Sequence, residues 1–176
     1  MEIRNSVLND LPKIFELYHI ATNFMQSKNQ VAWPEFSRDL IIEEIEDLRQ
    51  WKLLINGKIA CIWATTLKDE LIWGKENTDP SVYIHRIATD PYFRGQKLVK
   101  QIVRWADNYC INHHLDYIRM DTVGLNQGLI KHYEKLGFTF LGTKELDNVT
   151  NLPKHYSEGP VCLFQRKVKN KGKHSV

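Results

Sequence analysis

The chain of 176 residues has few of the features that mark membrane, exported or nucleic-acid-binding proteins. No apolar run approaches the roughly 20 residues that a membrane-spanning helix needs. The opening stretch MEIRNSVLND is charged and lacks an apolar core, so we expect no secretory signal and a cytoplasmic location. The net charge of +3 is too small to indicate a nucleic-acid partner, and basic residues are interleaved with acidic ones.

Cysteine is equally scarce, and its spacing argues against a disulfide framework. The cysteines form no CxxC pair: Cys61, Cys110 and Cys162. An odd number of widely separated cysteines favours buried free thiols in a reducing compartment. His113, His114 and Asp116 follow Cys110 closely enough to suit zinc. A helix C-terminus that attracts histidine through its dipole explains them more simply, so we expect no metal.

What the sequence does contain is an alternation of predicted strands and helices typical of one globular domain. Hydrophobic residues make up 43% and charged residues 26%, as in ordinary soluble domains. Strands are predicted at Ile3–Arg4, on both sides of Asn56-Gly57, and at Val82–Thr89, Leu115–Thr122, Phe138–Glu145 and Val161–Val168. Helices are predicted to open at Asp10–Pro12, to run from a Ser37 cap to about Asp47, and to cover Gln96–His113 and Asn126–Leu136. Hairpins followed by β-α-β crossovers predict an α/β (α+β) fold with a mixed sheet.

The stretch HRIATDPYFRGQKLVKQIV, residues 85–103, is predicted to be a strand end, a loop and a helix start. Unpaired amides and a partial positive charge at a helix N-terminus suit a phosphate. We call Arg94–Val99 the phosphate loop, because Arg94, Gln96 and Lys97 add positive or polar groups there. With Gly95 as its one glycine, the loop by itself is equally consistent with an ordinary solvated connection.

The wider stretch IHRIATDPYFRGQKLVKQIV resembles the acetyl-CoA-binding motif of the GNAT superfamily of N-acetyltransferases. The downstream RMDTVGLNQGLIKHYEKLGFTFLG resembles the second half of that family, and IRNSVLNDLPKIFEL matches its usual start. The resemblance runs in order along nearly the whole chain. It implies a GNAT-like mixed, mostly antiparallel sheet of six to seven strands with helices on both faces. We expect one domain over residues 1–168 and a disordered basic tail over 169–176.

The resemblance also implies where acetyl-CoA binds. In the family, backbone amides of the phosphate loop hold the CoA pyrophosphate, and any non-proline residue supplies such an amide. Lys97 and Val99 stand where the motif has two small residues, which leaves a non-catalytic acyl-CoA-binding or sensor domain as the alternative. The residues matched to the cofactor are Ile87, Ala88, Thr89, Arg94, Gly95, Gln96, Lys97, Leu98, Val99, Asn126 and Tyr133.

The implied reaction is direct transfer of an acetyl group from acetyl-CoA to a primary amine of a small molecule or peptide. In the family, amides of the strand Ile87–Thr89 contact the thioester and stabilise its oxyanion. Tyr133 matches the tyrosine that returns a proton to the CoA thiolate; the alternative is a half-buried helix residue. Asn126 matches an asparagine beside the cofactor arm, or else caps the helix that it begins.

The amine must lose a proton before it attacks, because an alkylamine has a pKa of roughly 10.4. His85 lies two residues before Ile87 on the same side of the strand, and an ordinary histidine pKa near 6.5 suits a base. A structural histidine is the alternative. Asp121 is the other candidate base, unless it forms an ion pair with Arg86 or Arg119.

Specificity for the acceptor is expected to lie in two loops, residues 26–37 and 67–80. Trp33 and Trp73 lie in or beside these loops and are the predicted acceptor-binding residues, together with His85, whereas Trp63 is predicted to be core. Acidic residues of the second loop indicate a cationic amine: Glu70, Glu76 and Asp79. We therefore expect acetyl-CoA and an amine as partners, with no nucleic acid and no membrane, and a homodimer remains open.

Overall fold

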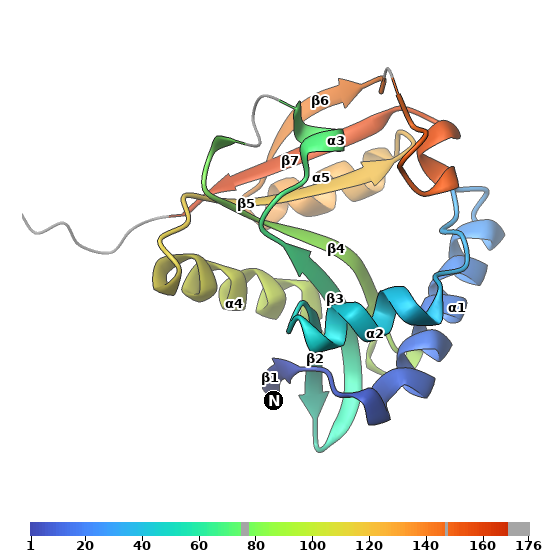
Figure 1. Cartoon of the computed structure of the whole chain (residues 1–176), viewed down its shortest axis with the longest axis vertical. Coiled ribbons are helices and arrows are strands. Elements are labelled where there is room, and N and C mark those ends of the chain that lie inside the picture. The colour runs from blue at the N-terminus through green and yellow to red at the C-terminus, as the bar shows by residue number, and fades with distance from the viewer. Residues whose placement is uncertain (75–77, 147, 169–176) are drawn as a thin grey trace, which may run out of the picture.

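The computed structural model describes residues 1–74, 78–146 and 148–168. Within these residues the chain forms one seven-stranded sheet in the order β1-β2-β3-β4-β5-β7-β6 (Figure 1). The strands are β1 (Glu2–Asn5), β2 (Gln50–Ile55), β3 (Lys58–Thr66), β4 (Ser81–Thr89), β5 (Tyr117–Val123), β6 (Thr139–Lys144) and β7 (Val161–Lys167). The helices are α1 (Leu11–Ser27), α2 (Arg38–Glu46), α3 (Glu70–Trp73), α4 (Leu98–Asn112) and α5 (Gln127–Lys135). Short 3-10 turns are η1 (Leu8–Asp10), η3 (Pro91–Phe93) and η4 (Lys154–Ser157).

The predicted mixed, mostly antiparallel sheet is confirmed. All neighbouring strands run antiparallel except β4 and β5. The β2–β3 turn is the expected Asn-Gly hairpin, since Asn56 (φ 50°) and Gly57 (φ 76°) both have positive φ. No helix in the described part of the chain is both long and apolar enough to cross a membrane.

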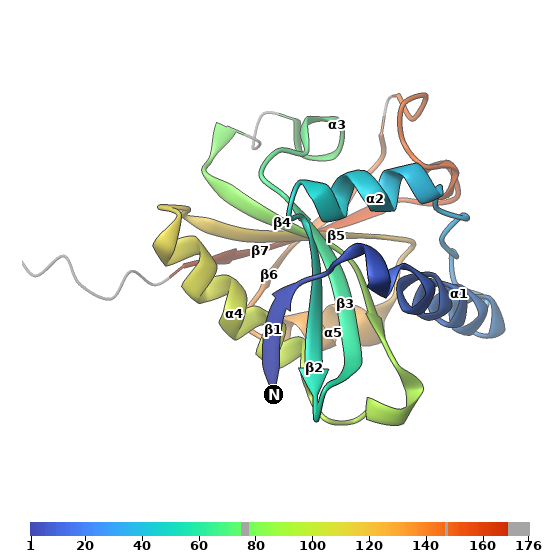
Figure 2. The ribbon, with the colours of Figure 1, turned by 60° about the horizontal axis from the view of Figure 1, so that its bottom comes forward.

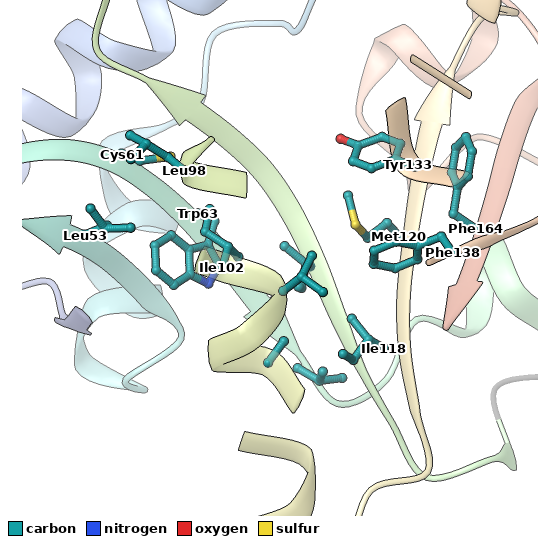
Figure 3. Packing of buried hydrophobic residues seen from close by; sticks show 14 of the residues in the cluster. Leu53, Cys61, Trp63, Leu98, Ile102, Ile118, Met120, Tyr133, Phe138 and Phe164 are labelled. Carbon is teal, nitrogen blue, oxygen red and sulfur yellow. The ribbon is translucent and has the colours of Figure 1, made fainter. Parts of the chain in front are cut away.

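Helices cover both faces of the sheet, as Figure 2 shows. Helices α4 and α5 bury their apolar sides in the main core, where Trp63 of β3 is 0% exposed, as predicted (Figure 3). Helices α1 and α2 pack on the opposite face against Ile62 and Ala88. Cys61 belongs to the main core and the adjacent Ile62 to the opposite cluster, because successive side chains of a strand point to opposite faces of the sheet. Strand β3 is therefore buried on both sides.

The sheet divides between β4 and β5. These strands pair over Ser81–Tyr117, Val82–Ile118 and Tyr83–Arg119 only. Beyond that point β4 stays paired with β3, and β5 stays paired with β7. Arg86 (φ 54°) is the extra residue of a bulge in β4, which turns this strand away from β5. The backbone edges that face each other across the opening border the candidate site.

The glycine of the KLGF stretch has a steric role. Gly137 follows α5 with φ 87°, and a Cβ there would collide with Nη1 of Arg166. Arg166 donates to the Leu136 carbonyl (3.1 Å) and pairs with Asp107 (3.0 Å). Arg166 thereby ties the end of α5 to β7 and α4, which holds α5 in place beside the opening.

Candidate active site

A cavity of about 900 Å³ lies where β4 and β5 separate. Its walls come from α1, the segment 29–36, α2, β3, β4, β5, α5 and the segment 152–156 before β7. Several predicted site residues share this lining: Trp33, His85, Ile87, Asn126 and Tyr133. Ala88 does not line it, because its side chain is buried against α1 and α2. The predicted loop 26–37 therefore forms one wall, and the loop between β6 and β7 forms another.

The phosphate loop lies at the start of α4. This helix begins at Leu98 rather than at the predicted Gln96, because Lys97 adopts a left-handed conformation (φ 57°, ψ 38°). Gly95 is also left-handed (φ 82°), and no side chain caps the first turn of α4 in the described structure. Amides at this helix end and the exposed Arg94 and Lys97 are therefore placed to hold an anion.

We expect Lys97→Gly to weaken CoA binding several-fold, because the substitution removes a cation beside the loop amides. Binding should also become less sensitive to salt, since screening weakens a charge contact more than hydrogen bonds. Glycine adopts the φ of 57° without strain, so the free energy of unfolding should rise by about 1 kcal/mol. Titration calorimetry at several salt concentrations and denaturant unfolding measure the two effects.

The matched control is Lys97→Ala, which removes the charge but keeps a Cβ in the left-handed conformation. Val99→Gly should instead lower the free energy of unfolding by about 1 kcal/mol, because Val99 lies inside the first turn of α4 and glycine is unfavourable within a helix. Tighter binding by Lys97→Gly at every salt concentration would show that the lysine obstructs the loop, and would favour the sensor alternative.

Tyr133 projects from α5 into the opening. Its ring packs against Phe138 and Phe164, with centroids 5.9 Å and 5.0 Å away. Figure 3 shows the hydroxyl directed away from both phenylalanines, and the residue lines the cavity. Burial, with added repulsion from Asp121 and Cys61, raises the pKa of Tyr133 above its ordinary value. The hydroxyl therefore stays protonated near neutral pH and is able to act as an acid.

Asn126 is the N-cap of α5, as one of its two sequence interpretations expected. Its Oδ1 accepts a hydrogen bond from the amide of Leu129 (3.0 Å). The residue also lines the cavity. The cap uses the amide oxygen, so a contact with a cofactor would have to come from the amide nitrogen.

His85 lies between two carboxylates. Its Nε2 is 3.7 Å from Oδ2 of Asp69, and its Nδ1 is 3.7 Å from Oδ1 of Asp121. Oδ2 of Asp121 accepts a hydrogen bond from the hydroxyl of Tyr156 (2.8 Å). Side-chain exposure falls from 22% for His85 to 11% for Asp69 and 3% for Asp121. The cluster thus reaches from the cavity surface into the interior.

Burial changes the proton affinities of this cluster. Burial and the neighbouring Arg86 lower the pKa of His85 to about 4, well below the ordinary value near 6.5. Burial and the Asp121 charge raise the pKa of Asp69 to about 7. Burial also raises the pKa of Asp121 to about 6, against the opposing hydrogen bond from Tyr156. The two carboxyl groups, rather than the imidazole, therefore titrate near neutrality.

The same three side chains offer donor atoms within 4.8 Å of one another, which is close enough to consider a metal ion. Each ring nitrogen of His85 has its shortest carboxylate contact with a different residue, Nε2 with Asp69 and Nδ1 with Asp121. At the far end of α4, Cys110 is buried and donates to the Tyr117 carbonyl, whereas His113 and His114 are exposed.

Other predicted acceptor residues lie elsewhere. Trp73 is 0% exposed, packs against Tyr83 (5.7 Å between centroids) and does not line the cavity, so its predicted role in acceptor binding is wrong. Asp79 pairs with Arg119 (2.6 Å), Glu70 is exposed, and Glu76 lies outside the described residues. The acidic lining of the cavity consists instead of Glu44, Asp69 and Asp121.

The alternative in which Asp121 pairs with an arginine is also wrong. Arg119 pairs with Asp79, and Arg86 pairs with the buried Glu44 of α2. The Arg86 guanidinium lies over the Phe36 ring, 4.7 Å from its centroid. Asp121 is thereby left facing His85 and Tyr156.

Sequence reasoning missed Asp69 and Tyr156. Asp69 belongs to the predicted acceptor loop 67–80 but was not singled out within it, and Tyr156 belongs to η4 in the loop between β6 and β7. Neither has a periodic pattern or a motif around it. A long loop that carries an aromatic residue beside a predicted site was the available signal.

Comparison with known proteins agrees with the geometry. A sequence profile of the Acetyltransferase (GNAT) family matches residues 14–138. The chain is 31% identical over 74 residues to the "Uncharacterized N-acetyltransferase YesJ" of Bacillus subtilis (strain 168), which covers 42% of this chain and 41% of YesJ. The match thus spans less than half the length of that relative.

Solved structures share the fold over nearly the whole chain. A GNAT-family acetyltransferase of Streptococcus agalactiae has a TM-score of 0.74 at 23% identity, covering 97% of this chain and 96% of that chain. The structure of yncA from Salmonella typhimurium with its cofactor acetyl-CoA has a TM-score of 0.68 at 14% identity, covering 100% of this chain and 98% of that chain. Since the family profile covers most of the sequence that builds the divided sheet, the chain belongs to the GNAT family of acetyltransferases.

Proposed function

We propose that this protein is an N-acetyltransferase that moves an acetyl group from acetyl-CoA to a primary amine of a small molecule or peptide. The observation that carries the proposal is that one cavity joins Tyr133 on α5 to the Asp69–His85–Asp121 cluster. Tyr133 is a protonated acid, and the cluster contains two carboxylates that titrate near neutrality. An acid for the thiolate and a base for the ammonium are the two groups that such a transfer uses.

Each part of the chain has a role in this proposal. Amides of the phosphate loop hold the pyrophosphate at the start of α4. Backbone amides of β4 at Ile87–Thr89 polarise the thioester carbonyl and stabilise the oxyanion that attack creates. Tyr133 donates its proton as the carbon–sulfur bond breaks. Attack is direct, through a complex that contains both substrates, because two residues matched to the cofactor, Ile87 and Tyr133, line the same cavity as the predicted acceptor residue Trp33.

The acceptor is proposed to be an amine without a carboxylate of its own. Two cations line the cavity, but Arg86 already pairs with Glu44, and Arg49 already pairs with Glu43 and Asp47, each at 3.0 Å. These pairs neutralise the groups that would otherwise recognise an acidic acceptor. Aromatic walls at Trp33 and Phe36, with Asp69 at the polar end, suit a single ammonium on an apolar body.

Addition of acetyl-CoA is expected to shift the backbone amide resonances of Arg94–Val99 and Ile87–Thr89. The reason is that the proposal places acetyl-CoA against both segments. Two-dimensional NMR of the labelled chain measures these shifts. If those amides remain unchanged while another region responds, the placement of the cofactor is wrong.

Release of free CoA thiol is then followed with a panel of arylalkylamines, polyamines, acidic amino acids and short peptides. Acetylation of neutral-bodied monoamines supports the proposed acceptor, and preference for acidic amino acids contradicts it.

The second candidate function is a non-catalytic acyl-CoA sensor, favoured by the strained Lys97 at a position where the family motif has a small residue. Tight binding of acetyl-CoA with no transfer to any amine would support the sensor.

A further inference from the structure

We propose that Arg86 is a positioning residue for acetyl transfer, because its side chain holds the β4 bulge in the form that sets the direction of the Ile87 amide. The inference rests on the proposed function, in which amides of Ile87–Thr89 stabilise the oxyanion. It assigns to one buried side chain the task of aiming that donor. In the sequence, Arg86 was considered only as an ion-pair partner of Asp121.

The side chains of β4 change faces at the bulge. Before it, Val82 and Ile84 pack in the main core, so the two-residue period of a strand would place Arg86 there as well. Instead, Ile87 packs against the main core and Ala88 against the opposite cluster. The bulge thus keeps a charged side chain out of the apolar core and shifts the residues after it by one position.

The pairing register shows the same step. Ile62 and Ala64 lie two positions apart on β3, whereas their partners on β4, Ala88 and His85, lie three positions apart. The extra residue is Arg86, whose left-handed φ of 54° is unfavourable for a residue with a Cβ. Such a residue persists only where its surroundings hold it, and residues of this kind cluster at functional sites.

Contacts on the side of α1 and α2 hold Arg86. Its Nη2 pairs with Oε1 of Glu44 on α2. The guanidinium lies 4.7 Å from the centroid of the Phe36 ring and 5.4 Å from that of the Tyr18 ring on α1. The side chains of Arg86 and Glu44 are only 12% and 6% exposed, so solvent screens this ion pair weakly. The bulge is thereby fixed to two helices through one side chain.

The bulge lies beside the opening of the sheet. Strand β4 pairs with β5 only as far as Tyr83, so beyond that residue one backbone edge of β4 has no neighbouring strand among the described strands. Ile87 directly follows Arg86 and lines the cavity together with Tyr133. Because one peptide group joins Arg86 to Ile87, a change in the backbone angles of Arg86 turns the Ile87 amide. A donor that is fixed in advance stabilises an oxyanion best.

The test observes the thioester carbonyl of bound acetyl-CoA, labelled with ¹³C, by difference infrared spectroscopy without an acceptor. A hydrogen bond to the carbonyl oxygen lowers its stretching frequency, so in the parent we expect a lower frequency than in solution. Arg86→Met should lose most of this shift and slow single-turnover transfer about 30-fold. The loss stays below the roughly 10²–10³-fold of a removed oxyanion donor, because the amide remains but is misaligned. The Kd for acetyl-CoA should stay within about threefold, since the phosphate loop is unchanged.

Three further variants complete the experiment. Arg86→Lys keeps a cation for Glu44 and should retain most of the carbonyl shift, with transfer within about fivefold of the parent. Arg104→Met removes an exposed arginine of α4 and should change neither the carbonyl frequency nor the transfer rate. Glu44→Gln serves where Arg86→Met does not fold: a neutral amide holds the guanidinium less firmly, so transfer should fall about tenfold with a partial loss of the shift.

Denaturant unfolding of the same variants separates positioning from stability. If Arg86→Met is less stable but keeps the carbonyl shift and the transfer rate, Arg86 is only structural, and the positioning role is overturned while the acetyltransferase proposal stands. A parent that acetylates amines without any carbonyl shift would also overturn the positioning role, because no β4 donor would then act on the thioester. A parent that binds acetyl-CoA but acetylates no amine would overturn both proposals.

Discussion

Tyr133→Phe is expected to lower kcat about 100-fold while the Kd for acetyl-CoA stays within about twofold of the parent. The hydroxyl is the sole difference between the two side chains, so contacts of the ring with Phe138 and Phe164 persist. General acid catalysis contributes roughly 10²–10⁴-fold, and the lower end applies because a thiolate with a pKa of roughly 8.5 leaves fairly well unaided. Single-turnover kinetics and titration calorimetry measure chemistry and binding separately.

The matched control is Tyr109→Phe, which removes a hydroxyl from α4 outside the cavity lining and should leave kcat unchanged. Tyr133 must be protonated to act, and its pKa is raised. The lower kcat of Tyr133→Phe should therefore appear at every pH near neutrality. Full activity in Tyr133→Phe would remove this tyrosine from the mechanism. A parallel rise in Kd would indicate that the hydroxyl positions acetyl-CoA instead.

Arg119→Met is expected to lower the free energy of unfolding by about 3–5 kcal/mol. Arg119 is 0% exposed and pairs with Asp79 at 2.6 Å. It also donates to the Tyr83 hydroxyl (3.1 Å) and to Oε1 of Gln165 (2.8 Å). Methionine fills much of the volume but leaves the Tyr83 hydroxyl and Oε1 of Gln165 without their donor. Denaturant unfolding of the parent and the variant measures the difference.

Arg104→Met on the exposed side of α4 is the control and should change stability by less than about 0.5 kcal/mol. The Asp79 carboxylate is 47% exposed and regains water, so the loss should fall nearer the lower end of the range. A loss below about 1 kcal/mol would show that water replaces the guanidinium. Since Arg119 lies in β5 next to the point where β4 and β5 separate, a large loss would locate a main support of the divided sheet there.

Much of the fold follows from short-range signals. Ser37 accepts the Leu40 amide and begins α2 as its sequence position predicts, and Asn56-Gly57 makes the expected hairpin. Such caps and turns are decided by a few adjacent dihedrals and hydrogen bonds. Helix α3 has no comparable local signal. It has four residues, and Ile72 and Trp73 are held in it by burial against Tyr83 and Val161, which lie far away in the sequence.

By itself, the sequence determined the family resemblance, the order of strands and helices, and the presence of Trp33, His85 and Tyr133 at one cavity. These depend on residue spacing along a motif, which is a local property. Only the tertiary structure brought Asp69 and Tyr156 to the same cavity, because they come from separate loops that meet through sheet pairing. Burial in that assembled site lowers the pKa of His85 and raises those of Asp69 and Asp121. Loss of solvation depends on every element packed around a group, so no local stretch of sequence encodes it.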